Sequence, residues 1–237
     1  MQYVSVVAAV LNEGDNIEKF LYMLNETEGV NEVIIVDDGS TDSTIDKIKN
    51  FKGRFRVKLI ERKRKGGTVS AQIDGARLAS NEYVVVMDAD LQHDPSIIPK
   101  MLSVATQGYD LVVASRLVEG GVSKRDAIRG MISRGATFLA HLFIPQTNKI
   151  RDVMSGYFLA KRDIVAGLPP VDNSYKLLLY IFAYVRGLKC VEIPYAFSPR
   201  ASGESKVVSG PGFLITYMVE LMHYVRVEYN SEVGRNV

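Results

Sequence analysis

The stretch Val84-Val-Val-Met-Asp-Ala-Asp-Leu-Gln-His93 joins an apolar run to two carboxylates that are separated by one small residue. The apolar part, Tyr83–Met87, has the length and the β-branched content of a buried strand in a parallel sheet. Asp88 and Asp90 follow at the point where open α/β sheets bind their ligands. Mg²⁺ and Mn²⁺ prefer carboxylate and phosphate oxygens, so this pair predicts a divalent metal site. The alternative, a polar helix cap, explains the following Asp94-Pro95 but neither of the two acids.

Further apolar runs and helical patterns flank this strand. We expect strands at Val4–Leu11, Glu32–Val36, Val57–Ile60, Tyr83–Met87 and Asp110–Ala114, and helices at Asp15–Asn25, Ser43–Asn50, Thr68–Ala79 and Pro95–Thr106. The first helix opens on Asp15-Asn-Ile-Glu18, which has the spacing of a capping box. Strands and helices that alternate in this way predict an α/β fold with a doubly wound, mostly parallel sheet.

The second half of the chain has a different pattern. We expect a long helix at Lys124–Ile144, an extended segment at Asp152–Ala160, a buried helix at Tyr175–Arg186, an edge strand at Lys189–Phe197 and an apolar helix at Phe213–Tyr229. Residues 199–212 are rich in Gly and Pro and predict a loop. The long helix is basic at its start and apolar from Phe138 to Phe143, a pattern typical of helices that lie in a membrane interface.

The composition excludes several classes of protein. The 237 residues carry a net charge of +2, so we expect no nucleic-acid partner. A single cysteine, Cys190, leaves no disulfide framework. We find neither a signal-peptide pattern nor an apolar stretch that could span a bilayer, and we expect a cytoplasmic location. Basic residues cluster between Arg116 and Arg134, which predicts contact with phosphate or with an anionic membrane surface.

Polar residues follow the predicted central strands at their carboxyl ends. One edge of a parallel sheet would hold the acidic pair together with Asn12-Glu13, Asp37-Asp38 and Ser115-Arg116. Asp37 could accept hydrogen bonds from a nucleoside or form the Asx turn that Asp-Asp-Gly-Ser favours. The two roles are compatible, and Asp38 could form the turn instead. Gly66-Gly67 either lets backbone N–H groups approach a phosphate or forms a plain turn. The chain contains neither a Gly-x-Gly-x-x-Gly motif nor a P-loop.

Three motifs resemble those of family 2 glycosyltransferases of the GT-A fold: Asp37-Asp-Gly-Ser-Thr-Asp42, Asp88-Ala-Asp-Leu-Gln-His-Asp-Pro95 and Gly203-Glu-Ser-Lys206. More narrowly, polyprenol-phosphate (dolichol-phosphate) mannose synthases are similar at Gln92, at Asp152-x-x-Ser-Gly-Tyr157 and at Arg200-Ala-Ser-Gly-Glu-Ser-Lys206. The resemblance implies a GT-A catalytic domain at residues 1–210, with a nucleotide-sugar half at about 1–116 and an acceptor half at about 117–210. A C-terminal amphipathic or apolar helix would follow at 211–237.

The resemblance also implies roles for individual residues. The metal, Mg²⁺ or Mn²⁺, would be bound by Asp88, Asp90 and Gln92. The nucleotide-sugar donor would be bound by Glu13, Asp37, Asp88, Asp90 and Lys206, and the acceptor phosphate by Arg116, Arg129, Ser133 and Arg200. The catalytic residues would be Asp90, Arg116 and Arg200. Many relatives carry an acidic base near residues 175–186, and the apolar run that stands there suits an acceptor whose phosphate oxygen is already ionised.

These implications define one expected reaction. We expect transfer of a hexose, with mannose from GDP-mannose favoured, to a polyprenol (dolichol) phosphate with inversion. UDP-glucose as donor stays open, and so do a soluble metal-dependent nucleotidyltransferase and a Mg²⁺-binding receiver-like module. Many relatives continue into transmembrane helices; here the helices at Arg125–Ile144 and Phe213–Tyr229 would attach the protein peripherally to the cytoplasmic face of a membrane. A separate small membrane subunit is left open as a further partner.

Overall fold

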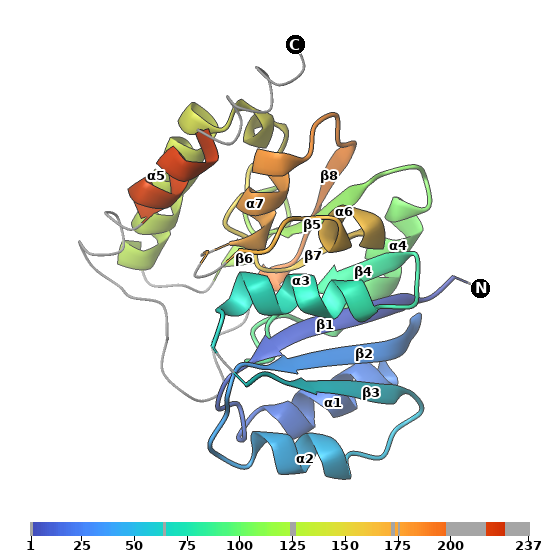
Figure 1. Cartoon of the computed structure of the whole chain (residues 1–237). Coiled ribbons are helices and arrows are strands. Elements are labelled where there is room, and N and C mark those ends of the chain that lie inside the picture. Colours follow the sequence, from blue (N-terminus) through green and yellow to red (C-terminus); the bar gives the residue numbers. More distant parts are fainter. Residues whose placement is uncertain are drawn as a thin grey trace.

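A seven-stranded sheet in the order β3-β2-β1-β4-β7-β5-β8 forms the centre of the molecule (Figure 1). The computed structural model describes residues 2–63, 65–123, 127–171, 174, 176–197 and 217–225, with the backbone alone at 123 and 127–131. The strands are β1 (Val4–Val10), β2 (Val30–Asp37), β3 (Arg56–Glu61), β4 (Tyr83–Val86), β5 (Leu111–Ser115), β7 (Phe158–Lys161) and β8 (Cys190–Pro194). β7 runs antiparallel to β4 and β5, and the remaining neighbours pair in parallel. The predicted mostly parallel α/β sheet is confirmed.

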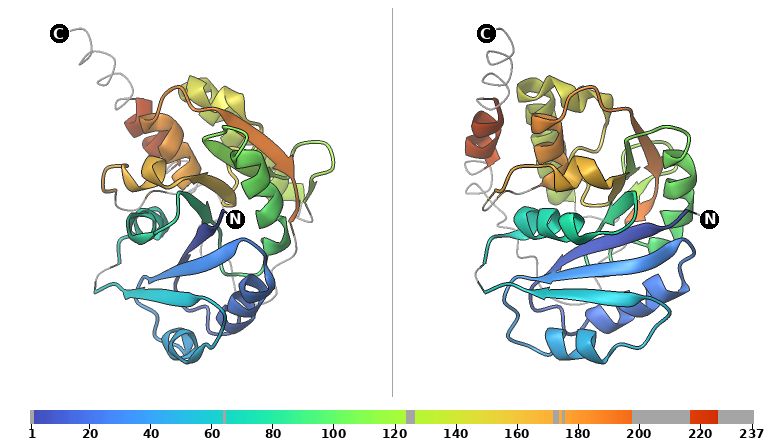
Figure 2. Two further views of the ribbon diagram at one scale, coloured as in Figure 1. Left: turned by 90° about the vertical axis from the view of Figure 1, so that its right-hand side faces the viewer. Right: turned by 45° about the vertical axis from the view of Figure 1, so that its right-hand side comes forward.

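Helices cover both faces of the sheet, and its central strands are therefore buried on both sides (Figures 1 and 2). One apolar core lies under α1 (Ile17–Glu26), α2 (Thr44–Asn50) and α4 (Ile98–Ala105). The other lies under α3 (Thr68–Leu78), α5 (Ala127–Phe143), α6 (Arg162–Ala166) and α7 (Leu177–Tyr184). Two 3₁₀ helices, η1 (Pro95–Ile97) and η2 (Pro145–Lys149), and a small parallel sheet of β6 (Val122–Ser123) and β9 (Ala196–Phe197) complete the described elements.

The helical segment 217–225 lies beside α5, at the end of the molecule away from α2 (Figures 1 and 2). Its Tyr217 hydroxyl donates a hydrogen bond of 2.9 Å to the backbone oxygen of Ala136 in α5. Tyr217, Leu221 and Tyr224 are buried in the same core as α7. Within the described part of the chain, no helix is long and apolar enough to cross a membrane.

Two local predictions are wrong. The expected capping box does not form: α1 begins at Ile17, and its N-cap residue, Asn16, makes no side-chain cap bond. Instead, the backbone oxygen of Glu13 accepts hydrogen bonds from the N–H groups of Asn16 and Ile17, and the Asn16 amide donates to the Glu13 carboxylate at 2.8 Å. The segment expected to be extended from Asp152 turns until residue 157 and becomes a strand only at Phe158, because its polar side chains bind neighbouring loops.

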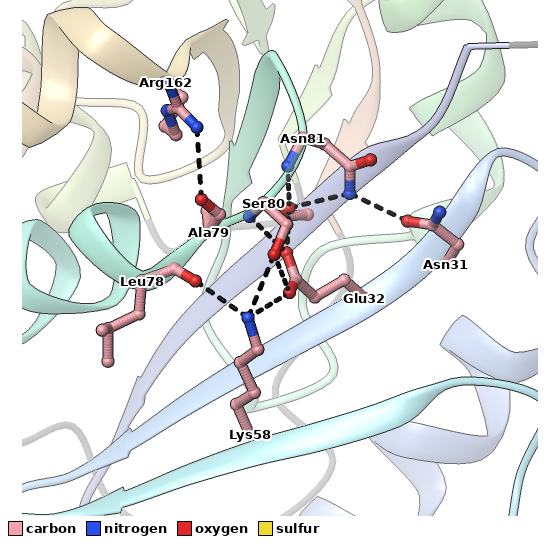
Figure 3. A network of polar contacts seen from close by, with 9 residues as sticks. Asn31, Glu32, Lys58, Leu78, Ala79, Ser80, Asn81 and Arg162 are labelled. Carbon is pink, nitrogen blue, oxygen red and sulfur yellow. Dashed lines mark hydrogen bonds and ion pairs between the residues drawn. The ribbon is translucent and has the colours of Figure 1, made fainter.

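A polar network closes the edge of the sheet where β1 and β2 begin (Figure 3). The largely buried Glu32 carboxylate accepts hydrogen bonds from Ser5, from the Ser80 backbone and hydroxyl, and from Lys58. Burial raises the pKa of Glu32, but the bonds from Lys58, Ser5 and Ser80 outweigh burial and hold that pKa below its usual value. The stabilisation is therefore complete above the usual glutamate pKa and is lost as the pH falls through the folded-state pKa. The role of this network is therefore to stabilise the fold.

Candidate functional site

Four loops meet at the carboxyl edge of the sheet. β1, β2 and β4 are parallel neighbours, and β5 has the same direction as β4 because β7 is antiparallel to both. The first two loops are tied to each other: the Asn12 N–H donates to the Ser40 hydroxyl, and the Thr41 N–H donates to the Asn12 side chain, both at 2.8 Å. Glu13 N–H donates to the Thr44 hydroxyl at 2.9 Å. The predicted convergence of the strand ends is confirmed.

The two aspartates after β2 have separate roles in the structure. Asp37 forms the turn: its carboxylate accepts from the Gly39 N–H at 3.0 Å, from the Ser40 N–H at 2.9 Å and from the Ser40 hydroxyl. Asp38 accepts from the N–H groups of Gly66 and Gly67, each at 3.1 Å. The assignment of the turn to Asp38 is therefore wrong. The backbone N–H groups of Gly66-Gly67, considered as a phosphate cradle, hold the second aspartate instead.

The acidic pair after β4 lies in a tightly turned loop. Asp90 is 4% exposed and its Oδ1 accepts the Gln92 N–H at 3.2 Å, while Asp88 is partly exposed. Leu91 has a φ of +65°, and Asn12 after β1 has a φ of +51°. They are the described non-glycine residues with positive φ, and both lie at this edge. Backbone held in a sparsely populated conformation concentrates at functional sites, so the observation supports a site here.

The oxygen atoms of this loop suit a hard divalent ion. Two carboxylates and one amide side chain are compatible with Mg²⁺ or Mn²⁺, which keep several positions for water and phosphate oxygens. Among the described residues, no group of three or more His, Cys, Asp or Glu side chains gathers as a metal site. The described acidic side chains of this loop therefore do not form a complete metal site by themselves.

His93 supports the acidic loop. Its ring is 4% exposed, and its Nδ1 accepts a hydrogen bond of 3.2 Å from the Asp88 N–H. The ring stacks on Tyr157 with centroids 5.1 Å apart. This hydrogen bond and the stacking tie the imidazole to the backbone of the acidic loop. Packing and one hydrogen bond therefore account for the buried position of His93.

Arg116, the predicted phosphate-binding and catalytic arginine, is fixed by a buried ion pair. The exposed fraction of its side chain is 4%, and that of its partner, Asp152, is 0%. The guanidinium donates to the carboxylate from Nε at 2.7 Å and from Nη2 at 2.6 Å, and the Arg116 N–H adds a third bond at 3.0 Å. Burial lowers the pKa of Arg116, but the bonds to Asp152 outweigh burial and raise that pKa, so the guanidinium stays charged.

The rest of the 152–157 segment joins the end of β5 to the acidic loop. The Ser155 hydroxyl donates to the Ala114 backbone oxygen at 2.8 Å, and the Tyr157 hydroxyl donates to the Asp94 backbone oxygen at 3.0 Å. Asp94 itself caps η1 through the Ser96 N–H at 2.9 Å, as predicted. The Asp152-x-x-Ser-Gly-Tyr157 motif thus positions an arginine and a carboxylate loop relative to each other.

Sequence reasoning missed Lys176, the residue immediately before α7. A Cβ placed on Gly156 would lie 3.3 Å from Asp88 Oδ2, 3.5 Å from Lys176 Nζ and 3.6 Å from the His93 ring. The ammonium group and the first aspartate therefore flank the same glycine. The available signal was weak: a lone cation directly before the apolar run Leu177–Val185.

Four of the predicted site residues lie either on α5 or outside the described residues. Ser133 is on α5 and is partly buried. Arg129 precedes Ser133 by four residues on the same helix, so the two positions share one helix face. At Arg129 the structure describes only the backbone. Arg200 and Lys206 lie outside the described residues.

The sheet order and the acidic loop after β4 define a GT-A-type α/β glycosyltransferase fold. The chain belongs to glycosyl transferase family 2, whose model matches residues 5–168. A solved structure with the same fold is glucosyl-3-phosphoglycerate synthase from Mycobacterium tuberculosis in complex with UDP. It is 20% identical, with a TM-score of 0.70 over 94% of this chain and 80% of that chain.

Two relatives are similar in sequence over almost the whole chain. The dolichol-phosphate mannosyltransferase of Pyrococcus furiosus is 37% identical over an alignment of 238 positions that covers 99% of this chain and 66% of the relative. The dolichol-phosphate mannosyltransferase of Saccharomyces cerevisiae is 30% identical over an alignment of 233 positions that covers 92% of this chain and 85% of the relative. The chain thus spans just under two thirds of the archaeal relative.

Proposed function

We propose that this protein transfers mannose from GDP-mannose to a polyprenol (dolichol) phosphate with inversion at the anomeric carbon. The observation that carries the proposal is the identity of 37% with an archaeal dolichol-phosphate mannosyltransferase over 99% of the chain. The acidic loop after β4 and the buried arginine after β5 lie at one sheet edge, as a donor with two phosphates and an acceptor with one would require. UDP-glucose is the second candidate donor, because the solved neighbour binds UDP.

The proposed mechanism relies on position and charge. Asp88, Asp90 and Gln92 would hold Mg²⁺ or Mn²⁺, which supplies positive charge to the leaving diphosphate. Asp37 and Glu13 would contact the nucleoside from the joined loops after β1 and β2. An acceptor phosphate oxygen forms the bond to the anomeric carbon while the bond to the diphosphate oxygen breaks, and the nucleoside diphosphate leaves with that electron pair. The acceptor oxygen is already anionic at neutral pH, so no protein base is needed.

The acceptor phosphate would be bound by cationic and hydroxyl groups: Arg116, Arg129, Ser133 and Arg200. Arg116 is pre-oriented by Asp152, so little side-chain entropy is lost when it contacts an anion. Residues 1–116 would bind the nucleotide sugar and 117–210 the acceptor, while 211–237 would add the C-terminal helix. Membership of family 2 disfavours both the nucleotidyltransferase and the receiver-like module.

A thermal-shift panel tests the donor. GDP-mannose with Mn²⁺ or Mg²⁺ should raise the melting temperature, because a ligand that binds only the folded state stabilises it by mass action. We expect a smaller shift without the metal and with UDP-glucose. A shift with UDP-glucose that exceeds the GDP-mannose shift would move the assignment to the second donor. The absence of any shift with either sugar nucleotide would contradict the proposal.

We place the protein peripherally at the cytoplasmic face of a membrane, held by α5 and the C-terminal helix. The four most exposed large apolar side chains of the described residues all lie on these two helices: Phe138 (68%), Leu142 (62%), Met222 (62%) and Val219 (61%). The acceptor is an amphiphile whose phosphate lies at headgroup level, so its enzyme must work at a bilayer surface. A separate small membrane subunit that covers the same side chains is the alternative occupant.

Liposome flotation tests this attachment. The sequence suggested Phe138 and Phe143 as lipid contacts, but Phe143 packs against the core, so the second position must be Leu142. We expect wild-type protein to float with anionic vesicles, less so at high salt, and Phe138→Glu with Leu142→Glu to release it. Leu78→Glu is the matched control, because Leu78 is 50% exposed at the end of α3. Unchanged flotation of the double variant would exclude this helix face as the anchor.

A further inference from the structure

The central sheet has an open edge at β3. In the strand order β3-β2-β1-β4-β7-β5-β8, β3 is terminal, so among the described strands it pairs on one side only, with β2. Figure 1 shows β3 at the margin of the sheet, next to α2. Residues 57–60, in the middle of this strand, are all partly exposed. The N–H and C=O groups along such a free edge can pair with another extended chain.

A groove with apolar walls lies beside this strand. It has a volume of about 340 Å³ and is lined by the end of α2, the turn at residues 51–53 and β3. Phe51 stacks on Phe55 with ring centroids 5.7 Å apart, and Tyr22, which is 51% exposed, meets the Phe51 ring edge-on at 5.3 Å. Two side chains of β3 complete the apolar lining: Val57 and Leu59. The groove can therefore take apolar side chains from a chain that lies along β3.

The groove is basic as well as apolar. The sequence from 47 to 60 contains six cationic residues and no acid: Lys47, Lys49, Lys52, Arg54, Arg56 and Lys58. Four of the six have polar partners within the fold. The other two, Lys52 and Arg56, line the groove, are exposed, and make no hydrogen bond or ion pair with any described residue. Two cations without a counter-charge therefore favour an acidic occupant.

Other occupants fit these observations less well. A second copy of the chain would pair β3 with β3 and bring the same cations together, and like charges on paired strands are destabilising. A bilayer would approach the opposite end of the molecule, where α5 and the segment 217–225 carry the most exposed large apolar side chains of the described residues (Figures 1 and 2). A cation on an edge strand also prevents unwanted pairing, but that purpose requires no apolar groove beside the strand. An acidic, extended segment suits the free edge, the groove and the cations together.

We propose that β3 and α2 form a docking site for an acidic, extended segment of a partner protein. The segment adds a strand to β3, places alternate apolar side chains in the groove and pairs its carboxylates with Lys52 and Arg56. Arg56 lies at the start of β3, whereas the candidate functional site lies at the carboxyl ends of the strands, so a docked segment leaves that site open. The inference is independent of the sugar donor and of the acceptor.

Synthetic peptides test this docking site. The probe is a fluorescein-labelled peptide in which glutamate and valine alternate. We expect saturable binding by fluorescence anisotropy that weakens at high salt, and slower hydrogen exchange of the β3 backbone N–H groups when the peptide is bound. Lys52→Glu with Arg56→Glu should weaken binding roughly tenfold or more, because two attractive charges become repulsive. Lys100→Glu, at an exposed site on α4, is the matched control and should change nothing.

Several results would overturn the proposal. One is failure of the wild type to bind the glutamate–valine peptide, and another is equal binding by the double variant Lys52→Glu with Arg56→Glu. Equal affinity for a peptide in which lysine replaces every glutamate would show that charge plays no part. Slow exchange at β3 in a dimer of the protein without peptide would assign the groove to a second copy. Both substitutions change exposed side chains, so an unchanged melting temperature of the double variant shows that lost binding is not lost folding.

Discussion

Asp90→Asn should lose roughly a hundredfold or more of the metal-dependent transfer rate, equal to about 2.7 kcal/mol of transition-state stabilisation. The side chain is 4% exposed, and its Oδ1 accepts the Gln92 N–H. Asparagine can keep that bond, so the loop should survive while the negative charge toward a divalent ion disappears. Asp88→Asn should have the same direction of effect, because it removes the other negative charge of the acidic pair in the same loop.

Asp94→Asn is the matched control for the acidic pair. Asp94 lies in the same loop, but its carboxylate caps η1 through the Ser96 N–H. Asparagine is also a good N-cap residue, so the expected loss of stability is well below the roughly 1 kcal/mol of a lost cap. Binding of GDP-mannose at matched Mn²⁺, measured by calorimetry for all three variants, checks the prediction. Near wild-type binding by Asp90→Asn would exclude a metal role for that carboxylate.

Arg116→Ala should destabilise the fold by about 3–5 kcal/mol, because it leaves the fully buried Asp152 carboxylate without its counter-ion. This expectation differs from that for Arg129→Ala and Arg200→Ala. Those variants should lose transfer by about a hundredfold if each removes a phosphate contact of roughly 2–3 kcal/mol. Loss of transfer by Arg116→Ala alone therefore cannot establish contact with phosphate.

A double variant separates the two roles of Arg116. Removing both partners in Arg116→Met with Asp152→Leu should cost less stability than Arg116→Ala, because no unpaired charge stays buried. If that double variant is folded but inactive, the guanidinium acts on a substrate as well as on Asp152. Urea denaturation with m-values gives the stability of each variant. A single Arg116→Ala variant as stable as the wild type would contradict the buried ion pair.

The regular parts of the fold follow from the sequence because their signals are local. Apolar runs such as Val4–Val10 and Tyr83–Val86 are buried on both faces, and buried parallel strands need little else to be recognised. The short acidic motifs place carboxylates at strand ends for the same reason. The antiparallel insertion of β7 between β4 and β5 is not encoded locally, since pairing partners far apart in the chain decide it.

The errors share one physical cause. The hydrogen bonds of Asp38 with the Gly66 and Gly67 N–H groups, and those of Arg116 with Asp152, join segments that are far apart in the chain. A sequence pattern shows which side chains can make such hydrogen bonds, but it does not show with which of the possible partners each side chain pairs. Lys176 was missed for the same reason, because nothing near it in the chain predicts that it lies beside Gly156, next to the acidic loop. The residues that connect loops are thus the hardest part of this site to predict.

Mannosyl transfer to a lipid phosphate tests the central proposal most directly. Purified protein would be incubated with Mn²⁺, radiolabelled GDP-mannose and vesicles that contain a polyprenyl phosphate, followed by extraction into organic solvent. We predict labelled lipid that depends on the metal and on the polyprenyl phosphate, is absent for Asp90→Asn, and carries mannose in the inverted, β configuration by NMR. Label that stays in the aqueous phase, while the Saccharomyces cerevisiae relative labels the lipid in parallel, would contradict the proposed function.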